Sequence, residues 1–235
     1  MSTQQTGPDH HRIEADDWNR IYVVGDVHGC LSELETLVEA LSPTGEDLVV
    51  FVGDLVRKGP DSAGVLAFVR ERENFRSVRS NNEQKLLDGE KDLSGLDEAD
   101  LDYLETLPLT ISWEGALVAH AGVDPRKALA DQTADDFLEF RSLDPAGSYD
   151  RPFWFERYEG PPTVFFGHTV LAEPVDREHA VGLDTGCVYG NALTAYDWHD
   201  ERFLSVPVER PLVDRSESKI VTPIHPPDPD DVRAR

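Results

Sequence analysis

The residues of this chain that could do chemistry follow short apolar runs, and most of them stand beside glycine. They are Asp26 and His28 in GDVHG, Asp54 in GDLVRKGP, Asn81 in RSNNE, His120 in VAHAG and His168 in FGHT. Short apolar runs are typical of buried strands, and in open α/β sheets the functional crevice lies at the carboxyl ends of the strands. Glycine permits sharp turns and close backbone approach there. We therefore expect these side chains to converge on one site.

The donor types in this set predict a metal site. Three imidazoles, two carboxylates and one amide oxygen suit Mn²⁺, Zn²⁺, iron or Ni²⁺, and they do not suit a metal that prefers thiolates. One ion would leave part of the set unused, whereas two ions about 3.5–4 Å apart, bridged by one carboxylate, would use all of it. Such a pair clamps a phosphoryl group and makes hydroxide available at neutral pH. The expected chemistry is in-line attack on phosphorus.

The elements that must position these residues alternate between strands and helices. Apolar runs at 21–24 and 48–52, each followed by Gly-Asp, predict buried strands, and the apolar positions of 31–41 form one helical face. Most of the chain after an acidic helix near 97–107 is expected to form strands. This order predicts an α/β sandwich of two mixed β-sheets flanked by helices. We expect a polar N-terminal lead-in over 1–17, one domain over 18–212, and a flexible acidic, proline-rich tail over 213–235.

Taken in order, the motifs GDVHG, GDLVRKGP, SNNE, HAG and GHT resemble the blocks of the calcineurin-like metallophosphoesterases, in particular their phosphoprotein-phosphatase branch. The resemblance covers about residues 20–207 and is strongest to symmetrical diadenosine-tetraphosphatases. It implies the metallophosphoesterase-type sandwich and two divalent transition metal ions, with Mn²⁺ favoured and Fe, Zn or Ni possible. It also implies a nucleophilic hydroxide that bridges the two ions. By this resemblance Asp26 and His28 hold the first metal, Asp54 bridges, and Asn81, His120 and His168 hold the second.

Two positions depart from the motifs of that family. The histidine of the family's GNHE block, usually assigned as proton donor to the leaving oxygen, is Asn82 here, and an amide cannot give up a proton. General acid catalysis is typically worth about 10²–10⁴-fold, so this change favours a leaving group that needs little help, such as a nucleoside diphosphate. Arg57-Lys58 replaces Asp-Arg, so Lys58 would bind phosphate as a point charge and Arg57 would add a second cation.

The family places a further phosphate-binding arginine before the GH block. Arg141, Arg151 and Arg157 are candidates that the sequence does not separate. The expected substrate-binding set is Arg57, Lys58 and Arg157, and the expected catalytic set is Asp54, Lys58 and Asn82.

The charge of the chain limits its partners. Its 46 acidic and 22 basic residues give a formal net charge of −24, which argues against binding long nucleic acid or an anionic membrane. An acidic surface with few lysines is typical of proteins that work in very high salt, where charge repulsion is screened. Two cysteines cannot form a disulfide framework, and no signal pattern or long apolar run is present, so we expect a cytoplasmic protein. The oligomeric state is left open.

The leading hypothesis is hydrolysis of a phosphoester or phosphoanhydride in a small phosphorylated nucleotide such as diadenosine tetraphosphate. The main alternative is a serine/threonine protein phosphatase. The late segment GLDTGCVYGNALTAYD also resembles bacterial RNA end-repair phosphatases, so an RNA-end phosphatase stays open. A phosphate-binding module with weak catalysis is the remaining alternative, motivated by Asn82 and Lys58.

Overall fold

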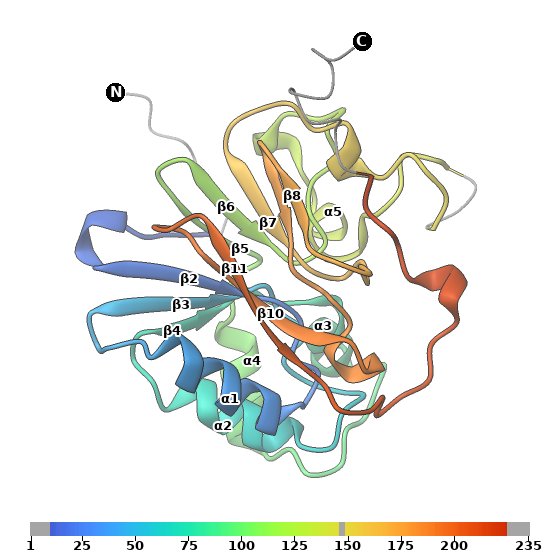
Figure 1. Ribbon diagram of the computed structural model, residues 1–235. Coiled ribbons are helices and arrows are strands. Elements are labelled where there is room, and N and C mark those ends of the chain that lie inside the picture. Colours follow the sequence, from blue (N-terminus) through green and yellow to red (C-terminus); the bar gives the residue numbers. More distant parts are fainter. Residues whose placement is uncertain (1–9, 146–148, 225–235) are drawn as a thin grey trace.

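The fold is a sandwich of two mixed β-sheets, seen in the computed structural model, which describes residues 10–145 and 149–224 (Figure 1). The first sheet has the strand order β1 (His10–Arg12), β5 (Thr110–Trp113), β6 (Ala116–Ala119), β7 (Thr163–Phe166), β9 (Ala180–Gly182), β8 (Val175–Arg177). The second has the order β11 (Arg202–Pro207), β10 (Ala192–Asp197), β2 (Arg20–Val24), β3 (Asp47–Phe51), β4 (Phe75–Ser77). Parallel pairs β2–β3 and β3–β4 lie beside the antiparallel pair β10–β2, which makes the second sheet mixed.

Helices cover the outside of the sandwich. The α-helices are α1 (Leu31–Leu41), α2 (Ser62–Arg70), α3 (Asn81–Leu87), α4 (Glu98–Thr106) and α5 (Ala134–Glu139). Short 3₁₀ turns are η1 (Ala15–Asp17), η2 (Leu129–Asp131), η3 (Trp154–Glu156), η4 (Cys187–Tyr189) and η5 (Glu217–Lys219). Figure 1 shows α1 and α2 against the outer face of the second sheet. The segment that contains η3 packs on the outer face of the first sheet.

Alternating side chains of the central strands build the core on both sides of the second sheet. Ile21 and Val23 of β2 pack between the two sheets, with Phe165 of the first sheet in the same cluster. Tyr22 and Val24 point the other way, into the cluster that includes Leu34 of α1. Because strand side chains alternate in direction, the part of a strand that is covered on both faces must be apolar, as Ile21–Val24 of β2 and Leu48–Phe51 of β3 are. The fold class expected from the sequence is therefore confirmed.

The ends of the domain differ from the expected boundaries. Residues 10–12, expected in a polar lead-in, form β1 and pair in parallel with β5, and the ring nitrogens of His10 lie 2.8 Å from Thr110 Oγ1 and 3.0 Å from Ser112 Oγ. Residues 213–224, expected in a flexible tail, pack against the body of the protein, where Val221 is buried and exchanges backbone hydrogen bonds with the chain around Leu171. The rest of both predicted ends, 1–9 and 225–235, lies outside the described residues.

Candidate active site

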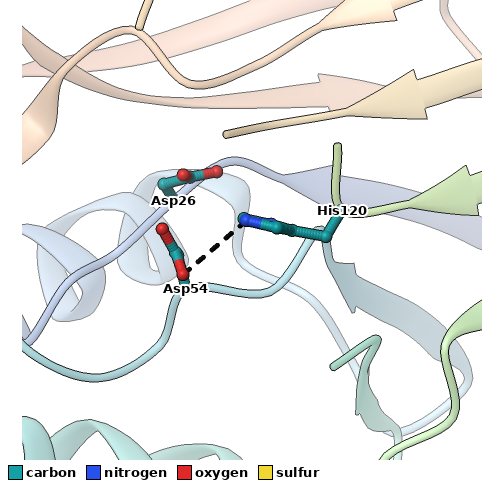
Figure 2. Close-up of side chains that lie close together, drawn as sticks. All are labelled: Asp26, Asp54 and His120. Atoms are coloured by element: carbon teal, nitrogen blue, oxygen red, sulfur yellow. Dashed lines mark ion pairs between the residues drawn. The ribbon is translucent and has the colours of Figure 1, made fainter. Parts of the chain in front are cut away.

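All six predicted ligand residues lie at or just after the carboxyl ends of strands. Asp26 and His28 follow β2, Asp54 follows β3, Asn81 begins α3 after β4, His120 follows β6, and His168 follows β7. The ligand atoms of Asp26, Asp54 and His120 lie within 4.8 Å of one another, and all three residues are buried. Figure 2 shows these side chains pointing toward one another from three separate loops.

Asp54 is the centre of the contacts. Its Oδ2 lies 3.1 Å from His28 Nε2, and its Oδ1 lies 3.7 Å from His120 Nε2. His28 Nε2 is also 4.0 Å from Asp26 Oδ2. His120 Nε2 lies 3.2 Å from Asn81 Oδ1. One oxygen of the Asp54 carboxylate thus faces His28 and the other faces His120, which is the position that a bridging ligand requires.

His168 joins the same cluster through Asp26 and His120. Its backbone N–H donates to the Asp26 carboxylate at 3.1 Å, and its ring centroid lies 5.0 Å from that of His120. Its Nε2 atom is buried without a hydrogen-bond partner. A buried, unpaired imidazole nitrogen is unfavourable unless something binds it. The structure thus brings all six expected residues together and leaves His168 Nε2 without a hydrogen-bond partner.

Backbone carbonyls orient two of the imidazoles. His28 Nδ1 donates to Val56 O at 3.2 Å, and His120 Nδ1 donates to Val52 O at 2.9 Å. Each bond places the ring proton on Nδ1 and leaves Nε2, the nitrogen that faces Asp54, unprotonated. Metal-binding histidines usually have their second nitrogen fixed in this way, which selects the tautomer and the ring direction.

The loops that carry the site have constrained backbones. His28, Asp54 and His168 all have positive φ angles, 51°, 51° and 63°, which are uncommon for residues with a side chain. Such conformations persist only where the surroundings fix them, and they cluster at functional sites. Gly167 has a different role, because a Cβ atom there would lie 1.9 Å from Asp26 Oδ1. Only glycine lets that carboxylate approach the strand end so closely.

The electrostatics of the cluster fit a site for cations. Burial and two neighbouring carboxylates raise the pKa of Asp26 well above its usual value. Burial also acts to raise the pKa of Asp54, but the neighbouring imidazoles of His28 and His120 and a nearby lysine outweigh it and hold that pKa well below its usual value. Burial lowers the pKa values of His120 and His168, which favours the neutral form that binds metal. Donor types, orientation and charge therefore all fit two divalent transition ions.

Ser80 and Glu83, at the start of α3, support the site, although neither was expected from the sequence to have a role there. The buried Glu83 carboxylate accepts N–H bonds from Asp54 (3.2 Å), Leu55 (3.0 Å), Val56 (3.3 Å) and Ser80 (2.9 Å). Ser80 caps α3 and donates from Oγ to Asp54 Oδ1. The Ser-x-x-Glu spacing is a capping-box pattern and could have indicated this helix start. Glu83 thereby ties the loop that carries Asp54 to the loop that carries Asn81.

The two departures from the family motifs contact each other. Arg57 Nη1 donates to Asn82 Oδ1 at 2.5 Å, and Asn82 Nδ2 donates to Asp54 Oδ1 at 2.7 Å. The Arg57 guanidinium thus fixes the amide of Asn82 with its N–H side toward the site. Lys58 is exposed, and its ammonium donates to His28 Nε2 at 2.6 Å. All three residues therefore contact residues of the predicted site.

Of the three candidate arginines, Arg141 is the one that contacts the site. Its Nη2 donates to His168 O at 3.2 Å, and its Nε is buried without a hydrogen-bond partner. Arg151 is held elsewhere, by Glu156 and by Thr222 O. Arg157, which was expected to bind substrate, is exposed at the end of η3, and the described structure gives its side chain no hydrogen bond to a site residue. A role for Arg157 in substrate binding therefore stays a prediction.

The fold and the buried Asp/His cluster together have the features of a metal-dependent phosphoesterase. The family model for calcineurin-like phosphoesterases matches residues 19–201. The chain belongs to the calcineurin-like phosphoesterases and is a hydrolase of phosphate esters or anhydrides.

Known relatives divide between two activities. The chain is 32% identical to a bis(5'-nucleosyl)-tetraphosphatase of the asymmetrical type from Bacillus subtilis, over 80% of this chain and 95% of that protein. It is 33% identical to serine/threonine-protein phosphatase 1 of Salmonella typhimurium, over 79% of this chain and 94% of that protein. The crystal structure of a proposed diadenosine tetraphosphatase superposes with a TM-score of 0.76 at 32% identity, covering 85% of this chain and 98% of that one. The chain therefore lies close to the diadenosine tetraphosphatases and to protein phosphatases of this family.

Within the residues that the structure describes, no helix is long and apolar enough to cross a bilayer.

Proposed function

We propose that this protein hydrolyses a phosphoanhydride bond in a small nucleotide, with a dinucleoside polyphosphate such as diadenosine tetraphosphate as the leading substrate. The observation that carries the proposal is the Arg57–Asn82 contact at the site. Where the family has a histidine that can give up a proton, this chain has an amide held by a fixed cation. The pair can stabilise negative charge on a leaving group, but it cannot protonate it.

The chemistry of the leaving group decides which substrate suits such a pair. A serine alkoxide is strongly basic and leaves slowly unless it receives a proton, so it depends on a general acid. A nucleoside diphosphate already leaves as a stable anion. An N–H donor and a guanidinium near that anion would stabilise it through charge-assisted hydrogen bonds. Asn82 and Arg57 therefore fit an anhydride better than a serine phosphate.

Asp26, His28, Asp54, Asn81, His120 and His168 would hold two divalent transition ions, with Mn²⁺ favoured. When bound, such a pair polarises phosphoryl oxygens and supplies hydroxide at neutral pH. The protein side chains have separate tasks. Lys58 remains a cation, because the carboxylate of Asp54 and the hydroxyl of Tyr189 raise its pKa despite partial burial, which acts to lower it. Lys58, beside His28, and Arg141, beside His168, would orient the substrate phosphate.

A serine/threonine protein phosphatase is the second candidate, and the Salmonella relative supports it. In that case the proton donor would have to be a group other than Asn82. The acidic balance of the chain, 46 acidic against 22 basic residues, gives no advantage in binding phosphopeptides that carry further acidic groups. The same balance fits an enzyme that acts in a salt-rich cytoplasm on small substrates.

A competition assay separates the two candidates. Purified protein in molar KCl with Mn²⁺ receives diadenosine tetraphosphate and a phosphoserine peptide together, and products are separated by chromatography. An Asp54→Asn/His168→Ala variant serves as the blank. Nucleotide products well ahead of dephosphorylated peptide are expected, and peptide dephosphorylated first would overturn the proposal. ADP as the sole nucleotide product would indicate symmetrical cleavage, whereas ATP with AMP would indicate asymmetrical cleavage.

A further inference from the structure

The segment 208–224, here called the returning segment, passes close to the site although it lies beyond the part of the chain that the family model matches. Figure 1 shows it in red, running from the end of β11 along the right-hand edge of the molecule. The N–H groups of Leu212 and Val213 donate to Val188 O at 3.0 and 3.1 Å. Further on, Val221 N donates to Val170 O at 2.8 Å. The segment is thus anchored on both sides of Arg215.

Two tyrosine hydroxyls hold the guanidinium of Arg215. Its Nη1 donates to Tyr189 Oη at 3.1 Å, its Nη2 donates to Tyr149 Oη at 2.7 Å, and its Nε donates to Lys219 O at 3.0 Å. The Arg215 Cζ atom also lies 4.7 Å from the Tyr189 ring centroid and 5.7 Å from that of Tyr149. These partners are neutral, so they fix the position of the cation without cancelling its charge.

A second cation shares one of these rings. Arg141 Cζ lies 4.6 Å from the ring centroid of Tyr149. Burial lowers the pKa of Arg141, and the positive charge of Arg215 lowers it further. The carboxylates of Glu139 and Asp184 act in the opposite direction on Arg141, but they do not outweigh its burial. Two like charges held on one tyrosine ring repel each other, and an anion that binds between them would relieve this repulsion.

The two arginines and two tyrosines connect to predicted metal-ligand residues on two sides, at His168 and at His28. Arg141 donates to His168 O at 3.2 Å. On the other side, Lys58 Nζ lies 5.4 Å from the Tyr189 ring centroid and 2.6 Å from His28 Nε2. The contacts therefore run as an arc from one ligand residue to another. In order, the cationic arc consists of Lys58, Tyr189, Arg215, Tyr149 and Arg141.

We propose that Arg215, held between Tyr149 and Tyr189, forms an anion subsite for the part of a nucleoside polyphosphate that extends beyond the phosphate at the metal centre. This inference rests on the proposed function, and it names the feature that would select polyphosphates over phosphate monoesters. A monoester reaches the metal centre and its nearest cations, Lys58 and Arg141. A longer phosphate chain would contact Arg215 as well, and the guanidinium would offer it planar, charge-assisted hydrogen bonds.

Competitive inhibition tests the subsite apart from the identity of the cleaved substrate. Hydrolysis of 4-nitrophenyl phosphate reports on the metal centre, and ADP and orthophosphate are the inhibitors, at fixed free Mn²⁺. The measured quantity is the ratio of the inhibition constant of ADP to that of orthophosphate. Arg215→Met is expected to raise this ratio about 10- to 100-fold, the range for loss of a hydrogen-bonded charge contact. Arg210→Met, an exposed arginine in the same segment, is the matched control and should leave the ratio unchanged.

Several outcomes overturn the subsite. A ratio within twofold of wild type in Arg215→Met does so, and so does an equal rise in both inhibition constants, which would mean that Arg215 only shapes the metal centre. Arg215→Lys keeps the charge and should raise the ratio by less than Arg215→Met. If Arg215→Met fails to fold, Tyr189→Phe with Tyr149→Phe removes both hydroxyl partners and should still raise the ratio severalfold. A wild-type enzyme that binds ADP through Arg215 but does not cleave diadenosine tetraphosphate would refute the proposed function and leave the subsite standing.

Discussion

Restoring a proton donor at the site should require two substitutions, Arg57→Asp and Asn82→His, because the two side chains touch. Arg57 Nη1 lies 2.5 Å from Asn82 Oδ1. In Asn82→His alone, the new imidazole would lie against a guanidinium. Two unit charges about 4 Å apart interact by about 1 kcal/mol in water and by about 4 kcal/mol at an effective dielectric constant of about 20.

That repulsion lowers the pKa of the introduced histidine. One pKa unit corresponds to about 1.4 kcal/mol, so the cation would lower the histidine pKa by about 0.7–3 units from about 6.5. The imidazole would then be almost wholly neutral at pH 7 and a poor proton donor. An aspartate at position 57 acts with the opposite sign and raises the pKa to about 7–9.5, so that most imidazoles carry a proton at pH 7.

The expected result is a gain that is not additive. Turnover of a phosphoserine peptide should rise less than about threefold in Asn82→His and in Arg57→Asp, and about 10- to 100-fold in the double variant, near the lower end of what general acids contribute. Steady-state rates from pH 5.5 to 9.5 measure this, with metal content per chain as the control. A single Asn82→His that equals the double variant would refute the reasoning. So would a double variant with full metal content and no gain.

Three further outcomes are expected. Glu83→Gln should lower the free energy of unfolding by about 3–6 kcal/mol, because one carboxylate oxygen that accepts two N–H groups becomes an amide nitrogen. A urea midpoint equal to that of the exposed control Glu39→Gln would contradict this prediction. Elemental analysis should find two transition ions per chain, and chelation should lower Tm; a single ion at saturation would exclude the two-metal centre. Lys127→Met should cost under about 1 kcal/mol at pH 7 and less in acid, once the pH is below the folded-state pKa of Asp136. Burial acts to raise the pKa of Asp136, but hydrogen bonds from Lys127 and Thr133 outweigh it and lower that pKa below 3.8, the usual value. The ion pair therefore contributes its full stability above the usual pKa of aspartate. This contribution is lost as the pH falls through the folded-state pKa. An equal loss at pH 7 and in acid would refute this account.

The sequence was informative where local pattern and global fold agree. Apolar runs that end in Gly-Asp predicted β2 and β3, and therefore the positions of Asp26 and Asp54, because a parallel strand buried on both faces must be apolar throughout. The helical apolar face over 31–41 predicted α1 with its observed bounds. The polar residues after these strands had only one edge of the sheets at which to meet, so their convergence could be foreseen.

Contacts between residues far apart in sequence could not be foreseen. Nothing local indicates that Arg57 meets Asn82, since that contact depends on how the loop after β3 turns over the start of α3. Prolines and charges made the chain after residue 213 look disordered, yet a single buried Val221 and a few backbone bonds anchor part of it. Arg141 was indistinguishable from Arg157 because exposure depends on tertiary packing. In each case the missing information was a long-range contact with no periodic signature.

The predicted metal ligands come from loops of both sheets, and this has a consequence for how the protein folds. Asp26, His28 and Asp54 all follow strands of the second sheet, whereas His120 and His168 follow strands of the first. The first ion would therefore be held within one sheet, and the second would span the seam between them. Any motion that parts the sheets would release the second ion first. Loss of that ion would loosen the seam itself, so binding of the second ion and docking of the two layers would be a single late event in folding.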